Sequence, residues 1–102
     1  MSRTTLQEFL RELDKRCLIV ASDGILESIE RSGRFLVVTL REGNFDLRVA
    51  IDLKFGHVFH FVLRRRGIPD LEVSPSVGLF SQLRELFMRR SDVQAAITPF
   101  MI

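Results

Sequence analysis

The chain is 102 residues long, with 46% hydrophobic and 27% charged residues and a formal net charge of +2 at pH 7. This length fits one domain, 1–102, and the apolar content excludes an intrinsically disordered chain. The apolar runs reach only four or five residues, which is too short to cross a membrane. The single cysteine excludes an internal disulfide and fits a reducing, intracellular compartment, cytoplasmic or nuclear.

The first predicted element is an amphipathic helix over residues 4–16. One face of its 3.6-residue period carries four large apolar residues, Leu6, Phe9, Leu10 and Leu13. Such a stripe needs a surface to pack against, either in the same chain or in a partner.

A four-stranded antiparallel meander is predicted over residues 17–63. The hydrophobic period changes to two in this stretch, which opens with the apolar run at 17–21. Short turns that contain glycine separate consecutive apolar segments, and this is typical of antiparallel neighbours. The four predicted strands are 25–31, 34–41, 45–53 and 57–63.

Two C-terminal helices are predicted within residues 76–98, after a loop at 67–75 that includes a short extended piece at 71–73. The first helix covers about 77–90, and the second begins at Ser91. The element order predicts an α+β fold with an N-terminal helix, a four-stranded antiparallel meander and two C-terminal helices.

No segment has the pattern of a catalytic or metal site. His57 and His60 lie three apart in a predicted strand, so they point to opposite faces and cannot easily share an ion. Cys17 ends an apolar stripe and is predicted to be a small core residue. Asp46 and Asp52 are predicted to belong to a solvated row of strand 45–53. We therefore predict no enzyme, no cofactor and no metal.

The most informative feature of the chain is an excess of apolar strand surface. Strands 34–41 and 57–63 carry apolar residues on both faces. Either helices of the chain cover both sides of the sheet, or the second face meets another protein.

The arginine run Arg64, Arg65 and Arg66 has three interpretations. It could be a solvated strand end that resists edge aggregation, a contact for the acidic surface of a partner, or, with Arg34 and Arg48, a contact for nucleic-acid phosphates. Phosphate binding would weaken steeply as salt rises, and an apolar interface would not.

The C-terminal third resembles the end of RWD-type domains. The resemblance rests on a proline-bearing loop, a helix with leucine spacing, a polar break and a last helix: Val73-Ser74-Pro75-Ser76-Val77, then Leu79, Leu83 and Leu86-Phe87, then Arg90-Ser91-Asp92-Val93. Compact domains of this type occur in kinetochore subunits and in the monopolin complex. The resemblance implies a non-catalytic scaffold that pairs with another copy or with a related domain.

The sequence therefore predicts a protein–protein interaction module that forms a homo- or heterodimer. Apolar residues of the first helix and of the second sheet face are predicted to meet the partner, with Arg64, Arg65 and Arg66 at the rim. If the chain is cut from a coiled coil, the best candidates for the dimer seam are Leu6, Phe9, Leu10 and Leu13. The alternative is a small nucleic-acid-binding module that uses an arginine-rich sheet edge.

Overall fold

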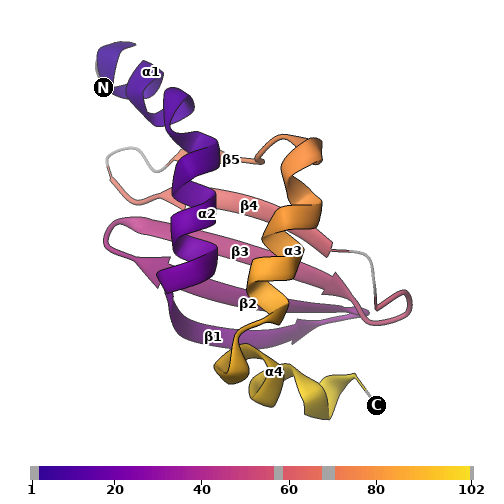
Figure 1. Cartoon of the computed structure of the whole chain (residues 1–102). Helices are drawn as coiled ribbons and strands as arrows, with labels where there is room; N and C mark the ends of the chain where they lie inside the picture. The colour runs from indigo at the N-terminus through magenta and orange to yellow at the C-terminus, as the bar shows by residue number, and fades with distance from the viewer. Residues whose placement is uncertain (1–2, 57–58, 68–70, 102) are drawn as a thin grey trace.

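The fold is a five-stranded antiparallel sheet with its main helices on one face (Figure 1). The computed structural model describes residues 3–56, 59–67 and 71–101. The strands lie in chain order: β1 (Ile25–Ser32), β2 (Phe35–Glu42), β3 (Phe45–Asp52), β4 (Phe59–Arg65) and β5 (Leu71–Val73). The helices are α1 (Arg3–Arg11), α2 (Leu13–Asp23), η1 (Val77–Leu79), α3 (Phe80–Met88), α4 (Ser91–Ile97) and η2 (Thr98–Phe100).

The predicted α+β class and the antiparallel meander are confirmed, but the number of strands was wrong. A fifth strand, β5, pairs with the end of β4 through Leu63↔Val73, Arg64↔Glu72 and Arg65↔Leu71. It has only three residues, and a strand of that length shows no readable alternation. Strand β4 also continues into the arginine run, while residues 57 and 58 lie outside the described part of the chain.

The prediction that the sheet region starts at residue 17 was also wrong. Helix α2 continues to Asp23. Backbone hydrogen bonds also continue across the break between α1 and α2, where Arg16 N donates to Glu12 O at 2.8 Å. The apolar run is helical because Leu13, Cys17 and Val20 extend the stripe at i, i+4 and i+7.

Gly24 ends helix α2. Its N–H donates to Val20 O, and a Cβ at this position would lie 2.5 Å from that oxygen. A glycine therefore allows the chain to turn directly from the helix into β1.

Two glycines set the register of the first hairpins. The β1–β2 and β2–β3 loops each have two residues, Gly33-Arg34 and Gly43-Asn44, and the glycines have φ values of 61° and 62°. Positive φ at the first central residue is the pattern of a type II′ turn, which matches the twist of the flanking strands. The predicted turns at these positions are confirmed.

The core lies between the sheet and helices α2 and α3. Alternate residues of β2, β3 and β4 face the helices, and the register aligns them in rows such as Val38↔Val49 and Val49↔Phe61. From the helices, Val20, Leu83 and their apolar neighbours fill the same layer. Each fully buried side chain of this kind stabilises the fold by about 1.5–3 kcal/mol.

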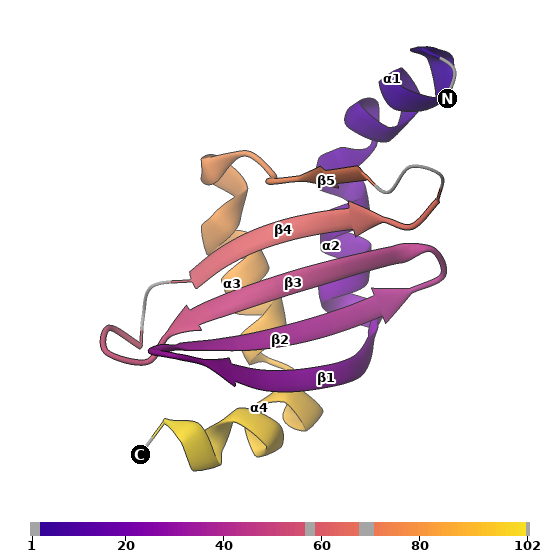
Figure 2. The ribbon, with the colours of Figure 1, turned by 180° about the vertical axis from the view of Figure 1, so that it is seen from behind.

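Helix α4 lies along the β1 edge of the sheet, where Val93 and Ile97 are buried (Figure 2). Because α2 and α3 lie on the same side, the alternative with a helical layer on each face of the sheet is wrong. The second face carries no helix of the described chain, and we call it the open face. None of the described helices is long and apolar enough to cross a membrane.

Candidate functional site

The open face is the candidate functional surface, and Figure 2 shows it in front of the helices. It carries the side chains that alternate with the core residues along each strand. The register places on it Ile25, Ser28, Glu30 and Ser32 of β1, Phe35, Val37, Thr39 and Arg41 of β2, Asp46, Arg48, Ala50 and Asp52 of β3, His60, Val62 and Arg64 of β4, and Glu72 of β5.

The centre of the open face is apolar. Val37 lies opposite Ala50, and Val62 of the next strand is diagonal to Ala50, so the three half-buried side chains form a stripe across β2, β3 and β4. A hollow of about 390 Å³ beside this stripe is lined by Val37 and Thr39 together with serines and charged residues, Glu30 and Arg48 among them.

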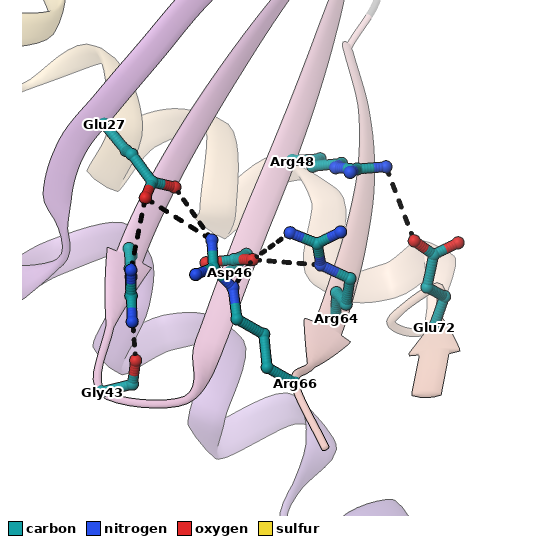
Figure 3. A network of polar contacts seen from close by, with 8 residues as sticks. Glu27, Gly43, Asp46, Arg48, Arg64, Arg66 and Glu72 are labelled. Carbon is teal, nitrogen blue, oxygen red and sulfur yellow. Dashed lines mark hydrogen bonds and ion pairs between the residues drawn. The ribbon is translucent and has the colours of Figure 1, made fainter. Parts of the chain in front are cut away.

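A cluster of ion-paired side chains, which we call the ion cluster, lies at one end of the open face (Figure 3). Arg64 donates to Oδ2 of Asp46 through Nη2 at 2.6 Å and through Nε at 3.0 Å, and Arg66 Nε donates to the same oxygen at 2.7 Å. Glu27 of β1 pairs with Arg66 at 3.2 Å and with Arg41 at 3.4 Å. The cluster therefore ties β1, β2, β3 and the end of β4 together.

Asp46 is the centre of this cluster and has no solvent exposure. Burial by itself raises the pKa of a carboxyl, but the hydrogen bonds and charges of Arg64 and Arg66 outweigh it and hold the pKa of Asp46 below its ordinary value. The prediction of a solvated row was wrong here, because strand pairing places Asp46 opposite both Arg41 and Arg64.

Asp52 forms a second, smaller cluster at the other end of the open face. It pairs with Arg34 at 2.8 Å, and its Oδ1 accepts the backbone N–H of Lys54 and of Phe55. Burial raises the pKa of Asp52, but the two backbone hydrogen bonds and the Arg34 charge outweigh it and lower the pKa. Asp52 is buried as well, so the prediction of a solvated residue was wrong here too.

Ion pairs with acids are found for four of the five arginines of the predicted phosphate-binding patch, Arg34, Arg48, Arg64 and Arg66. Arg34 pairs with Asp52, Arg48 with Glu72 at 3.5 Å, and Arg64 with Asp46. The exposed Arg48–Glu72 pair contributes little stability, but it still places a negative charge beside the arginine.

The arginine run is divided between the two faces of the sheet. Arg64 and Arg66 belong to the open-face cluster, whereas Arg65 lies opposite Phe45 on the helix side. Arg65 lines a small cleft there with Glu8 and Phe9 of α1. The three arginines therefore do not form one continuous basic patch.

The residues of the predicted apolar seam on the first helix differ in how far they are buried. Phe9 is buried and stacks on Phe45 with ring centroids 6.3 Å apart, and Leu13 packs against the core. Leu10 is 48% exposed. The side chain of Leu6 lies outside the described part of the structure.

Cys17 lies on the helix side of the sheet and His60 on the open face, so they do not belong to one site. Cys17 is fully buried on α2, where burial and then the charge of Asp14 raise the pKa of its thiol to about 12. His60 is exposed on the open face, and His57 lies outside the described residues. Within the described part of the chain, no group of three or more histidine, cysteine or acidic side chains is arranged to hold a metal ion.

Sequence reasoning missed the ion clusters, although one signal for them was present. Asp46 of β3 and Arg41 of β2 stand equally far from the Gly43-Asn44 turn, so a two-residue hairpin pairs them.

Comparison with protein-family models, with curated proteins and with solved structures finds no match for this chain.

Proposed function

We propose that the chain is a non-catalytic protein–protein interaction module that docks another protein chain on its open face, as a homo- or heterodimer. The observation that carries this proposal is a five-stranded sheet with helices on one face and, on the other, an apolar stripe between two ion clusters. An apolar centre inside a polar rim is the usual anatomy of a protein interface. Pairing of this kind is also what the resemblance to compact RWD-type domains implies.

The size of the open face supports a modest interface. Strands of seven or eight residues, at about 3.3 Å per residue and about 4.8 Å between strands, give a face of about 500 Å² over β1 to β4. A standard interface buries about 800 Å² per partner. The open face therefore suits an interface at the small end of the size range of protein interfaces.

The alternative of nucleic-acid binding receives less support. Carboxylates already neutralise Arg34, Arg48 and Arg64, so phosphates would have to compete with them. The strength of non-specific nucleic-acid binding depends on unneutralised cations. A salt titration against labelled oligonucleotides distinguishes the two functions.

The test is the mass in solution, by light scattering over a range of concentrations, together with affinity capture of a partner. Two variants address the open face: Val37→Asp in the stripe, and Glu30→Arg, an exposed change opposite Val37 that leaves the core intact. We expect each to weaken association about tenfold or more, whereas Val77→Asp, at an exposed residue of η1 outside the open face, leaves it unchanged. A strict monomer with no recovered partner contradicts the proposal, as does binding to oligonucleotides that falls steeply with salt.

A further inference from the structure

The edge of the sheet at β4 is only half covered. Strand β5 pairs with Leu63, Arg64 and Arg65, and no described strand pairs with the outer side of Phe59–Val62 (Figure 2). Main-chain groups point alternately to the two sides of a strand, so two of these four residues direct their N–H and C=O toward this edge. Unpaired groups of this kind can accept an added strand.

A groove with an aromatic floor lies beside this free segment. Its lining residues come from β4 and from the start of α3, and they are Phe59, Phe61, Val77, Phe80, Ser81 and Arg84, around a volume of about 290 Å³. The rings are held in place, because Phe61 meets Phe80 edge-on at 5.2 Å and Phe59 meets Phe87 at 6.0 Å. Because Phe59 and Phe61 are themselves only 8% and 1% exposed, an apolar side chain in the groove would contact mainly Phe80 and Val77.

Two features of the groove wall distinguish it from a gap in the core. Val77 is 79% exposed, the largest exposure among the big apolar residues of the described chain. Arg84 is the charged residue of the lining and brings a cation to the groove, beside the interaction that it already has within the chain. A groove with this wall suits an occupant that is apolar where it meets the rings and acidic where it meets Arg84.

We propose that the β4–α3 groove binds a short extended acidic segment of a partner protein, which adds as a strand to Phe59–Val62. The free edge spans about 13 Å, so it accommodates about four residues of an extended chain. The main chain of the segment pairs with β4, an apolar side chain enters the groove, and a carboxylate lies near Arg84. Main-chain pairing gives affinity and the groove gives specificity, as in other cases of strand addition.

This site is separate from the open face and goes beyond the proposed dimer. Its occupant is an extended peptide because the free backbone groups require an unfolded main chain as their partner, which a helix cannot supply. A second copy of the chain is a less suitable occupant. The long edge strand β1 has a register shift between Leu26 and Ser28, and a bulge of this kind opposes regular pairing.

The test uses a set of labelled hexapeptides that alternate glutamate with valine, leucine, isoleucine or phenylalanine. Binding to the full chain is measured by fluorescence anisotropy and mapped by NMR chemical shifts. We expect shift changes at Phe59–Val62 and along α3. N-methylation of the peptide backbone, which removes donors but keeps the side chains, should weaken binding about tenfold or more.

Two variants test the groove, with a matched control. Val77→Asp should weaken binding of the acidic peptides about tenfold or more, whereas Ile25→Asp, also at an exposed apolar residue, should not change it. Arg84→Glu should reverse the charge preference, so that lysine-containing peptides bind better than glutamate-containing ones. That exchange is a gain of binding, which an unfolded variant cannot give.

The failure of this inference can be told apart from failure of the proposed dimer. Val77→Asp should leave the mass of the free protein in solution unchanged, whereas the open-face variants should leave peptide binding unchanged. The inference is overturned if no peptide of the set binds at millimolar concentration, or if the shifts map to the open face or to β1. A change of self-association on Val77→Asp would instead indicate that a second copy occupies the groove.

Discussion

The two faces of the sheet bury residues by different means. On β3, Leu47, Val49 and Ile51 are buried under α2 and α3, while Asp46 on the opposite face is equally buried without a helix above it. Packing excludes water from the first face, whereas Asp46 is ion-paired with Arg64 and Arg66. The contrast shows that burial on this sheet does not require an apolar side chain. The variants below test how much each means of burial contributes to stability.

The largest expected effect comes from the helix-covered face. Phe61→Ala removes a ring that is 1% exposed and leaves a cavity between β4 and α3, so we expect the free energy of unfolding to fall by about 3–5 kcal/mol. The neighbouring Val62 points to the open face, and Val62→Ala should cost about 1 kcal/mol or less. Urea denaturation of both variants measures the difference, and equal losses would contradict the assignment of the faces.

The second largest expected loss of stability comes from removing Asp46 from the ion cluster. Asp46→Ala leaves the guanidinium groups of Arg64 and Arg66 without their shared acceptor, and we expect a loss of about 2–3 kcal/mol. Glu72→Ala removes an acid of the same face from an exposed pair with Arg48 and should cost less than about 0.5 kcal/mol. Thermal or urea denaturation gives both values. A small loss on Asp46→Ala would mean that the cluster does not stabilise the open face.

Acidic pH should lower the free energy of unfolding through the two buried carboxylates of the open face. The pKa values of Asp46 and Asp52 are lowered below the ordinary 3.8, so their contribution is fully present above about pH 5 and is lost as the pH falls through the lowered values. Urea midpoints between pH 7 and pH 2 should decline mainly below pH 4. Asp46→Asn should flatten this decline, and an unchanged slope would contradict the assigned role of the carboxylate.

The smallest expected effect is the absence of a reaction. The thiol of Cys17 is buried on α2, on the helix-covered side of the sheet, and its pKa is raised to about 12. It should therefore not react with a thiol reagent at pH 8 in the native protein. It should react promptly in urea. Rapid labelling of the native protein would show that α2 opens away from the sheet.

Local sequence patterns predicted the elements but not all of their partners. The alternation in β3 and the glycine turns at 33 and 43 are short-range signals, and both were confirmed. The run at 17–21 was misassigned because five consecutive apolar residues show neither helical nor strand periodicity and fit a strand or a buried helix equally well. Strand β5 was missed as a full strand because three residues become a strand only by pairing with β4.

For this protein, the sequence by itself determined the α+β class, the meander and its first two hairpins. These depend on period and turn chemistry, which act within a few residues along the chain. Only the tertiary structure decided that α2 and α3 share one face, that Asp46 is buried among arginines and that, among the described strands, β5 pairs with only half of the β4 edge. These features arise because residues far apart in the chain meet, and the energies of desolvation and ion pairing exist only once they have met.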